Sequence, residues 1–131
     1  MKVILDENVP HDLRAFLSHH ETFTVAYMGW GGVKNGKLLD AAEGVGFDVL
    51  ITGDKTLENE QNFSNRRIAL VALSAVNWPI IEPNVEKIIN AVDSAKPGTL
   101  MRIDCGTFSR RRPKPQEARL GDVAKSEGSE G

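Results

Sequence analysis

The sequence contains a single cysteine, Cys105, and no apolar run near the roughly 18 residues that a membrane-spanning helix needs. One thiol excludes an internal disulfide and a cysteine-based zinc site, so we expect Cys105 to be a small core or strand-end residue. The acidic pair Asp6 and Glu7 interrupts the first apolar run before the hydrophobic stretch of a signal peptide forms. These absences predict a cytoplasmic protein with no membrane segment.

Length and charge predict one domain followed by a tail. The 131 residues, 40% of them hydrophobic, suit a single core. Residues 109–131 are almost without apolar side chains and carry six Lys or Arg against four Asp or Glu, so the rest of the chain is acidic. We expect residues 1–108 to fold and residues 109–131 to be a disordered basic and polar tail. The tail either attracts phosphate groups or only adds solubility, and the second reading is favoured.

Short β-branched apolar runs alternate with stretches of helical periodicity, a pattern typical of repeated βα units. The expected strands are residues 2–6, 22–27, 47–52, 68–73 and 99–104. The expected helices are residues 11–20, a segment capped by Asn35 and ended by Gly44 and Gly46, and residues 85–96, with a helix or loop over 56–63 and a break over 79–83. The first and third strands are too apolar to be half exposed. We therefore predict an α/β fold with a central, mainly parallel sheet of about five strands and helices on both faces.

Acidic residues follow two of these apolar strands. Asp6 and Glu7 come at the end of the first strand, and Asp54 follows the third. In open parallel sheets, ligands bind outside the carboxyl ends of the strands, and converging carboxylates need a positive partner. Oxygen ligands suit Mg²⁺ or Mn²⁺, which activate water and neutralise phosphodiester charge. The alternative is that these acids serve only as turn and helix-cap residues.

Several neighbours of the acids are candidates for substrate binding, each with a structural alternative. Lys55 either contacts a phosphate or screens the acids, and Asn8 either holds a water or caps the first helix. Trp30, in a glycine-rich loop, either stacks on a base or packs on the core, with packing favoured. Asn35 is a candidate contact as well as a helix cap, and Asn62 belongs to a polar group that either lines a groove or lies in an exposed turn.

The three histidines need no catalytic role. His11 lies in the first turn of the first expected helix, where a solvated side chain is the favoured reading over a substrate contact. His19 and His20 come at the end of that helix, where partly positive side chains suit the helix dipole.

Four segments, VILDENVPHDL, GWGGVKNGKLLDAA, FDVLITGDKTLENEQN and KPGTL, together resemble a family of short bacterial PIN-like proteins related to VapC-type toxin ribonucleases. The resemblance spans nearly all of residues 1–104, and its sharpest elements are the LDEN and TGDK motifs. It implies a Rossmann-like three-layer fold, metal-dependent cleavage of RNA with Mg²⁺ or Mn²⁺, and inhibition by a small antitoxin protein; a homodimer is left open. By this resemblance, Asp6 and Asp54 match metal-binding aspartates, and Glu7 assists beside the first.

One position departs from the family pattern. PIN-like proteins usually supply a further acid from the helix after the glycine-rich loop, where this chain has Asn35 and Lys37. Asp40 and Glu43 lie further along that helix and are expected to point away from the strand ends. A site with fewer acids is expected to bind the metal more weakly. Alternatively, the domain has lost catalysis and keeps only a binding role.

Two other readings stay open beside the nuclease. A phospho-receiver also has an acidic pair after its first strand and an aspartate after its third, but its lysine should follow the fifth strand, whereas Lys96 precedes it. Ser74 alone does not restore the receiver pattern. A catalytically inactive PIN-like module that holds a partner is the second alternative.

Overall fold

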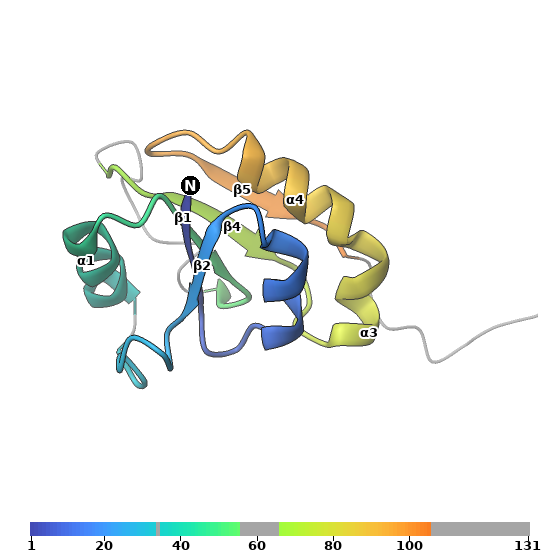
Figure 1. Cartoon of the computed structure of the whole chain (residues 1–131), viewed down its shortest axis with the longest axis horizontal. Helices are drawn as coiled ribbons and strands as arrows, with labels where there is room; N and C mark the ends of the chain where they lie inside the picture. The colour runs from blue at the N-terminus through green and yellow to red at the C-terminus, as the bar shows by residue number, and fades with distance from the viewer. Residues whose placement is uncertain (34, 56–65, 106–131) are drawn as a thin grey trace, which may run out of the picture.

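Helical segments separate most of the successive strands along the chain (Figure 1). The structure is a computed structural model that describes residues 1–33, 35–55 and 66–105. Within these residues the strands are β1 (Lys2–Leu5), β2 (Glu21–Thr24), β3 (Val49–Thr52), β4 (Ala69–Leu73) and β5 (Leu100–Ile103). The helices are α1 (Asn35–Val45), α3 (Trp78–Ile81) and α4 (Val85–Asp93), and the 3₁₀ helices are η1 (His11–Leu17) and η3 (Glu82–Asn84).

The five strands of the described residues form one parallel sheet in the order β2-β1-β3-β4-β5. Strand β1 lies between β2 and β3, with Leu5 in register with Thr24 on one side and Ile51 on the other. Every residue of β3 and β4 is buried, as expected of parallel strands covered on both faces. The predicted α/β class, and the closeness of the first and third strands, are confirmed.

Helices cover both faces of the sheet (Figure 1). Successive side chains of a strand point to opposite faces, so Val3 and Leu5 belong to one apolar cluster and Ile4 to the other. The first cluster packs under η1, α3 and α4, which supply Leu13 and Ile88 among others. The second packs under α1, with Leu38, Leu39, Ala42, Phe47, Leu50 and Leu70. The result is a three-layer arrangement of helix, sheet and helix.

Helix α1 ends in a Schellman motif just before Gly46, which has a φ of 92°. The backbone N–H of Gly46 donates to the carbonyl of Glu43 at 3.0 Å, and that of Phe47 donates to the carbonyl of Ala42 at 3.0 Å. A left-handed residue is needed at this position, and glycine adopts it without a steric penalty. The predicted stop at Gly46 is confirmed, whereas Gly44 lies inside the helix.

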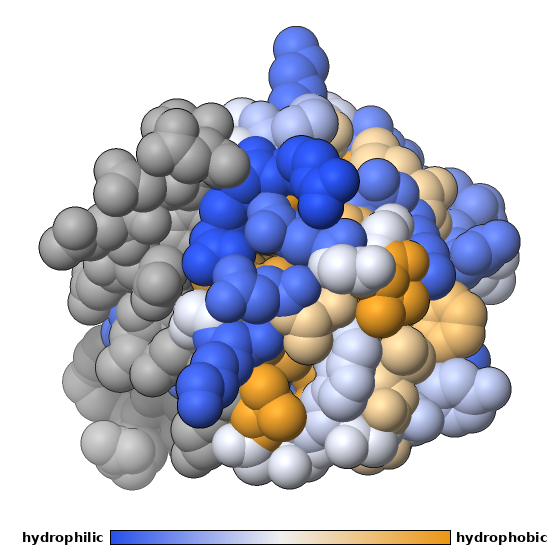
Figure 2. Space-filling view, turned by 90° about the vertical axis from the view of Figure 1, so that its left-hand side faces the viewer, coloured by the Kyte–Doolittle hydropathy of each residue, from blue (hydrophilic) through white to orange (hydrophobic). Residues whose placement is uncertain are grey.

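The face that carries α1 is mainly hydrophilic, with small separate hydrophobic areas (Figure 2).

Two acids of helix α1 hold Arg66: its Nη1 lies 3.0 Å from Asp40 and 3.1 Å from Glu43. Burial lowers the pKa of the Arg66 guanidinium, but its hydrogen bonds and charge interactions with the two acids outweigh burial and raise it. Glu43 also accepts hydrogen bonds from the N–H groups of Arg67, at 2.7 Å, and Ile68, at 3.3 Å. These contacts fix α1 to the entrance of β4.

The first helix differs from its prediction. Residues 11–20 were expected to form an α-helix, but the segment is a 3₁₀ helix that ends at Leu17. The carbonyl of Leu17 accepts hydrogen bonds from the N–H of His20, at 2.9 Å, and from the hydroxyl of Thr22, at 3.1 Å. These bonds turn the chain into β2, so His19 and His20 lie beyond the helix.

The expected break over residues 79–83 is also wrong, because α3 and η3 occupy it. Pro79 and Pro83 each stand in the first turn of a helical segment, where a missing N–H costs nothing. Helix α4 then ends at Asp93, a few residues before the expected end, and Ser94 leaves the helical conformation with φ −102° and ψ 6°.

The predicted strands are each right in position and differ from the observed strands by one to three residues at their ends. The expected helix or loop over residues 56–63 and the expected disordered tail over 109–131 lie outside the described residues. Cys105 is 6% exposed and lies two residues after the end of β5, where its N–H donates a hydrogen bond to Ser74 Oγ at 2.8 Å. The prediction that this cysteine is a strand-end residue is confirmed. In the described part of the chain, no helix has the length and apolar character needed to cross a membrane.

Candidate functional site at the carboxyl edge of the sheet

The sheet has its topological switch point between β1 and β3, because the chain leaves β1 toward β2 and returns on its other side. Ligand sites of open α/β sheets lie outside the carboxyl ends of the strands at this point. Asp6 directly follows β1, and its N–H continues the pairing by donating to the carbonyl of Ile51 at 2.9 Å. Asp54 comes two residues after β3. The two predicted aspartates are therefore at the same edge, on adjacent strands.

Asp6 is a buried carboxylate, with only 6% of the residue exposed. Its Oδ1 accepts a hydrogen bond from the N–H of Glu7 at 2.8 Å, and its Oδ2 accepts one from the hydroxyl of Thr52 at 2.6 Å. Two oxygens offer about four acceptor positions, so both can still bind a further partner. No Lys, Arg or His among the described residues forms an ion pair with this carboxylate.

Thr52 joins the two aspartates, a role that the sequence analysis missed. This last residue of β3 is fully buried. Its hydroxyl donates a hydrogen bond to the Asp6 carboxylate at 2.6 Å, and the same Oγ1 accepts a hydrogen bond from the N–H of Asp54 at 3.0 Å. One hydroxyl thus holds the side chain of one aspartate and the backbone of the other. The sequence offered a signal in the form of a polar residue at the end of an otherwise apolar buried strand.

Glu7 and Trp30 contact the glycine-rich loop and the core, respectively. The exposed Glu7 side chain accepts a hydrogen bond from the N–H of Gly32 at 3.3 Å, so its carboxylate holds this loop at the edge of the sheet. Trp30 is half-buried and meets Phe47 edge-on, with ring centroids 6.1 Å apart. The favoured prediction for Trp30, packing against the core, is confirmed.

Asn8 ties the loop after β1 to the loop after β3. Its Oδ1 accepts a hydrogen bond from the N–H of Gly53 at 3.3 Å, whereas η1 begins after Pro10 without any side-chain cap. The predicted helix cap at Asn8 is therefore wrong. A Cβ at Gly53 would overlap Cγ1 of Val76, so a larger residue here would force the Val76 side chain to move.

The remaining predicted residues divide into those that the structure describes and those that it does not. Asp40 and Glu43 bind Arg66 at the entrance of β4, which is the amino edge of the sheet, so the expectation that they point away from the site is confirmed. Asn35 starts α1, but its side chain lies outside the described part of the structure, as does all of Asn62.

A small pocket of about 170 Å³ lies at the carboxyl ends of β4 and β5. Lys55, which follows Asp54, lines it with Ser74, Arg102 and Asp104, and Ala72 and Ile103 complete the walls. Two cationic side chains, a hydroxyl and one carboxylate therefore line this pocket. This pocket can accommodate an anionic group such as a phosphate.

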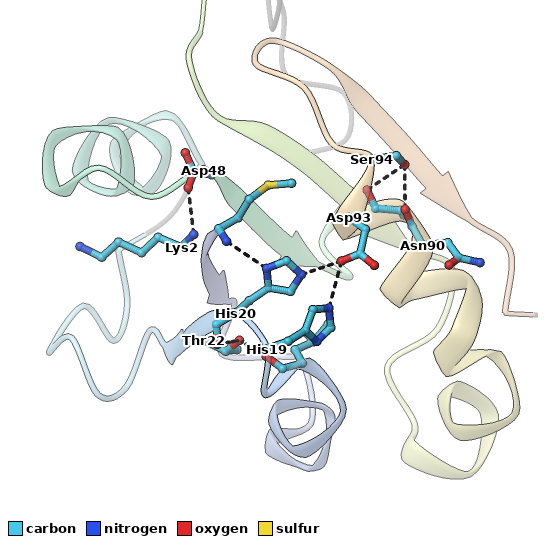
Figure 3. Close-up of polar contacts among 11 residues, drawn as sticks. Lys2, His19, His20, Thr22, Asp48, Asn90, Asp93 and Ser94 are labelled. Carbon is cyan, nitrogen blue, oxygen red and sulfur yellow. Dashed lines mark hydrogen bonds and ion pairs between the residues drawn. The ribbon is translucent and has the colours of Figure 1, made fainter.

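A second polar cluster lies at the opposite, amino edge of the sheet (Figure 3). The Nε2 atoms of His19 and His20 lie 3.0 Å and 2.7 Å from the same oxygen of Asp93. These hydrogen bonds, first that of His20 and then that of His19, hold the pKa of the Asp93 carboxyl below its ordinary value. The prediction that the two histidines serve the dipole of their own helix is wrong, because they face the end of α4.

Among the described residues, three potential metal ligands come within 4.8 Å of one another only at His19, His20 and Asp93. Asp6, Glu7 and Asp54 share an edge, and Thr52 joins the two aspartates, but the three carboxylates do not converge to that degree. Comparison of the chain with family models, curated proteins and solved structures gave no significant match. The interpretation of both clusters therefore depends on their geometry and chemistry.

Proposed function

We propose that the chain hydrolyses phosphodiester bonds in RNA, with Mg²⁺ or Mn²⁺ bound at the carboxyl edge of the sheet. The observation that carries the proposal is the Asp6 carboxylate, which is buried, oriented by two hydrogen-bond donors and without a cationic partner among the described residues. Burying a carboxylate is costly unless a positive charge compensates it. A bound cation offsets this cost.

The residues at this edge fit a hard divalent cation. Asp6 and Asp54 would hold it, and all the donors are oxygens, as Mg²⁺ and Mn²⁺ prefer. When bound, such an ion supplies Lewis-acid stabilisation of the charge that develops on a phosphodiester. Thr52 positions the Asp6 carboxylate, and Glu7, one residue further on, assists in binding or in positioning water.

The substrate is held by the positive side of the site. Lys55, the residue after Asp54, lines a pocket together with Arg102, and these cations can bind phosphate groups of a nucleic acid although the folded body as a whole is acidic. The choice of RNA, membership of the PIN-like class and inhibition by a small antitoxin protein rest on the resemblance of the LDEN and TGDK segments. They are part of the same proposal.

The test is cleavage of single-stranded RNA by the purified chain with Mn²⁺, with Mg²⁺ and with EDTA. We expect metal-dependent cleavage that Asp6→Asn and Asp54→Asn each abolish. Asp12→Asn is the matched control, because Asp12 is an exposed aspartate of η1, and this variant should cleave like the original chain. Cleavage that survives both substitutions, or none with either metal, contradicts the proposal.

One observation favours a phospho-receiver as a second candidate. The strand order β2-β1-β3-β4-β5 is the flavodoxin-like order, and Ser74 follows β4 on the same edge as Asp54. Against it, the residue after β5 is Asp104 where a receiver has lysine. Incubation with acetyl phosphate and Mg²⁺ separates the two, since a receiver gains a phosphate on Asp54 that Asp54→Asn removes. A chain that neither cleaves RNA nor takes up phosphate acts as a binding module.

A further inference from the structure

We propose that His19, His20 and Asp93 form a binding site for a first-row transition metal ion, with Zn²⁺ as the physiological occupant. One ring nitrogen of each imidazole and a carboxylate oxygen of Asp93 all lie within 4.8 Å of one another, and both Nε2 atoms are at 3.0 Å or less from that carboxylate. Figure 3 shows both rings turned toward the same carboxylate, His19 and His20 from the segment before β2 and Asp93 from the end of α4. This site is at the opposite edge of the sheet from Asp6 and does not depend on the proposed nuclease.

The donor set determines which metals the site takes. Two neutral imidazole nitrogens and one carboxylate are the ligands of many zinc sites that keep a position for water. Imidazole suits Zn²⁺, Co²⁺ and Ni²⁺, whereas Mg²⁺ prefers oxygen donors. The two edges of the sheet should therefore select different metals, a hard ion at Asp6 and a borderline ion at the histidines.

The position of Asp93 supplies an independent reason for a cation. Asp93 is the last residue of α4, and no basic residue occupies the last turn of this helix. The carboxyl end of a helix carries partial negative charge, so an acid there is unfavourable unless a positive group lies nearby. A metal ion bound to Asp93 would neutralise the charge of the carboxylate and also interact favourably with the partial negative charge at the end of α4.

The ligands combine order with access. The side chain of His20 is only 8% exposed, and its ring lies against that of His19 with centroids 4.1 Å apart, which limits rotation of both. The side chains of His19 and Asp93 are 51% and 46% exposed, so an ion can enter from solvent and water can complete its coordination. The site is partly preorganised and open on one side.

Metal binding requires a small rearrangement of protons and side chains. The N···O distances of 2.7 Å and 3.0 Å are hydrogen-bond distances, whereas ligands of a tetrahedral zinc ion stand about 3.3 Å apart. Each Nε2 must give its proton to solvent before it donates its lone pair to the metal. His20 Nδ1, now 3.0 Å from the Met1 amine, then carries the ring proton, so this amine must lose a proton or turn toward solvent.

A metal here would join two distant parts of the chain. His20 and Asp93 are 73 positions apart, so the ion would tie the segment between η1 and β2 to the end of α4. An ion that binds the folded state and not the unfolded chain stabilises the fold by mass action. We therefore expect Zn²⁺ to raise the melting temperature of the full chain.

The test uses Co²⁺ as a spectroscopic probe and Zn²⁺ in calorimetric titration of the full chain. We expect one Co²⁺ per chain with visible absorption, displaced by Zn²⁺, and binding at least about tenfold weaker in His19→Ala and in Asp93→Asn. His11→Ala is the matched control, because His11 is an exposed histidine of η1 outside the cluster. Binding that is absent at millimolar Co²⁺, or that both substitutions leave unchanged, overturns the proposal.

The same titration with Asp6→Asn separates this site from the proposed nuclease centre. This variant should lose its response to Mn²⁺ in RNA cleavage but bind Zn²⁺ as the original chain does. Loss of Zn²⁺ binding in Asp6→Asn but not in Asp93→Asn would place the zinc site at the carboxyl edge and contradict the assignment to His19, His20 and Asp93.

Discussion

The hydroxyl of Thr52 lies 2.6 Å from Oδ2 of Asp6 and donates a hydrogen bond to it, although the two residues are 46 positions apart in the chain. Both residues are buried, and the same Thr52 oxygen accepts the N–H of Asp54. A hydrogen bond to an ionised group contributes more than a neutral one. Thr52 is therefore a positioning residue for the proposed metal site and a contributor to stability.

Thr52→Val removes this hydroxyl while keeping the β-branched shape of the side chain. We expect the free energy of unfolding to fall by about 2 kcal/mol, because the Asp6 carboxylate loses a charge-assisted hydrogen bond in a buried setting. Denaturant unfolding followed by circular dichroism measures the loss. The stabilisation of the chain by Mn²⁺ should fall as well, since the carboxylate is no longer held in place.

Thr22→Val is the matched control for that experiment. Thr22 is also a buried strand threonine, but its hydroxyl donates to the neutral carbonyl of Leu17 at 3.1 Å. We expect a loss of about 1 kcal/mol and an unchanged response to Mn²⁺. Equal losses of stability and of Mn²⁺ response in the two variants would refute the positioning role of Thr52.

Asp6→Asn should separate stability from function. The substitution removes a buried charge that no cation among the described residues compensates, but it also replaces one of two accepting oxygens by an NH₂ group, so the free energy of unfolding without metal should change little. At the same time, stabilisation by Mn²⁺ should disappear. Thermal unfolding of both proteins with EDTA and with Mn²⁺ measures this. A variant clearly less stable in EDTA would show that Asp6 is a structural residue.

The two acids that hold Arg66 should differ in their contribution to stability. The Glu43 side chain is 15% exposed and also accepts two backbone N–H groups at the start of β4, whereas the Asp40 side chain is 71% exposed. We expect Glu43→Ala to cost about 2 kcal/mol and Asp40→Ala less than about 0.5 kcal/mol. Denaturant unfolding of both variants decides, and equal costs would contradict the role of the backbone contacts.

Lys55→Gln tests the cationic pocket. Lys55 is exposed, so the fold should be unaffected, but one phosphate contact should be lost from bound RNA. We expect weaker binding of single-stranded RNA in EDTA, and a slope of log affinity against log salt smaller by about 0.7. Lys87→Gln, an exposed lysine of α4, should bind like the original chain. Identical salt slopes for all three proteins would exclude Lys55 from the RNA surface.

The centre of the sheet was predictable because its two fully buried strands, β3 and β4, are short and mainly apolar. Their length and their β-branched residues favour strands over helices, and β3 and β4 lie within the predicted residues 47–52 and 68–73. The helix over 11–20 was predicted as α-helical because the apolar spacing of α and 3₁₀ turns is similar. It was predicted too long because its end depends on the hydroxyl of Thr22, five residues beyond Leu17. The segment after Trp78 was missed because its two prolines suggested a break, although each begins a helical turn.

The candidate sites differ in how far the sequence reveals them. Asp6 and Asp54 were found because strand ends of a parallel sheet share one edge, a rule that needs only the strand positions. Thr52 was missed because its hydrogen bond to the Asp6 carboxylate depends on the register between β1 and β3, which the sequence pattern does not give. Asp93 and the histidines were not connected because their meeting depends on how α4 packs beside η1, for which no local pattern exists.

The separation of contacting residues along the chain also predicts the order in which their contacts form during folding. Closing a long loop costs more chain entropy than closing a short one, so contacts between distant residues form late. Met1 and His20, at the start of the β1–β2 pair, are 19 positions apart, whereas Asp6 and Thr52 are 46 apart and His20 and Asp93 are 73 apart. A refolding chain is expected to close β1 onto β2 first, then complete the acidic edge, and close the histidine cluster last. Mn²⁺ and Co²⁺ binding would then time two successive steps of folding.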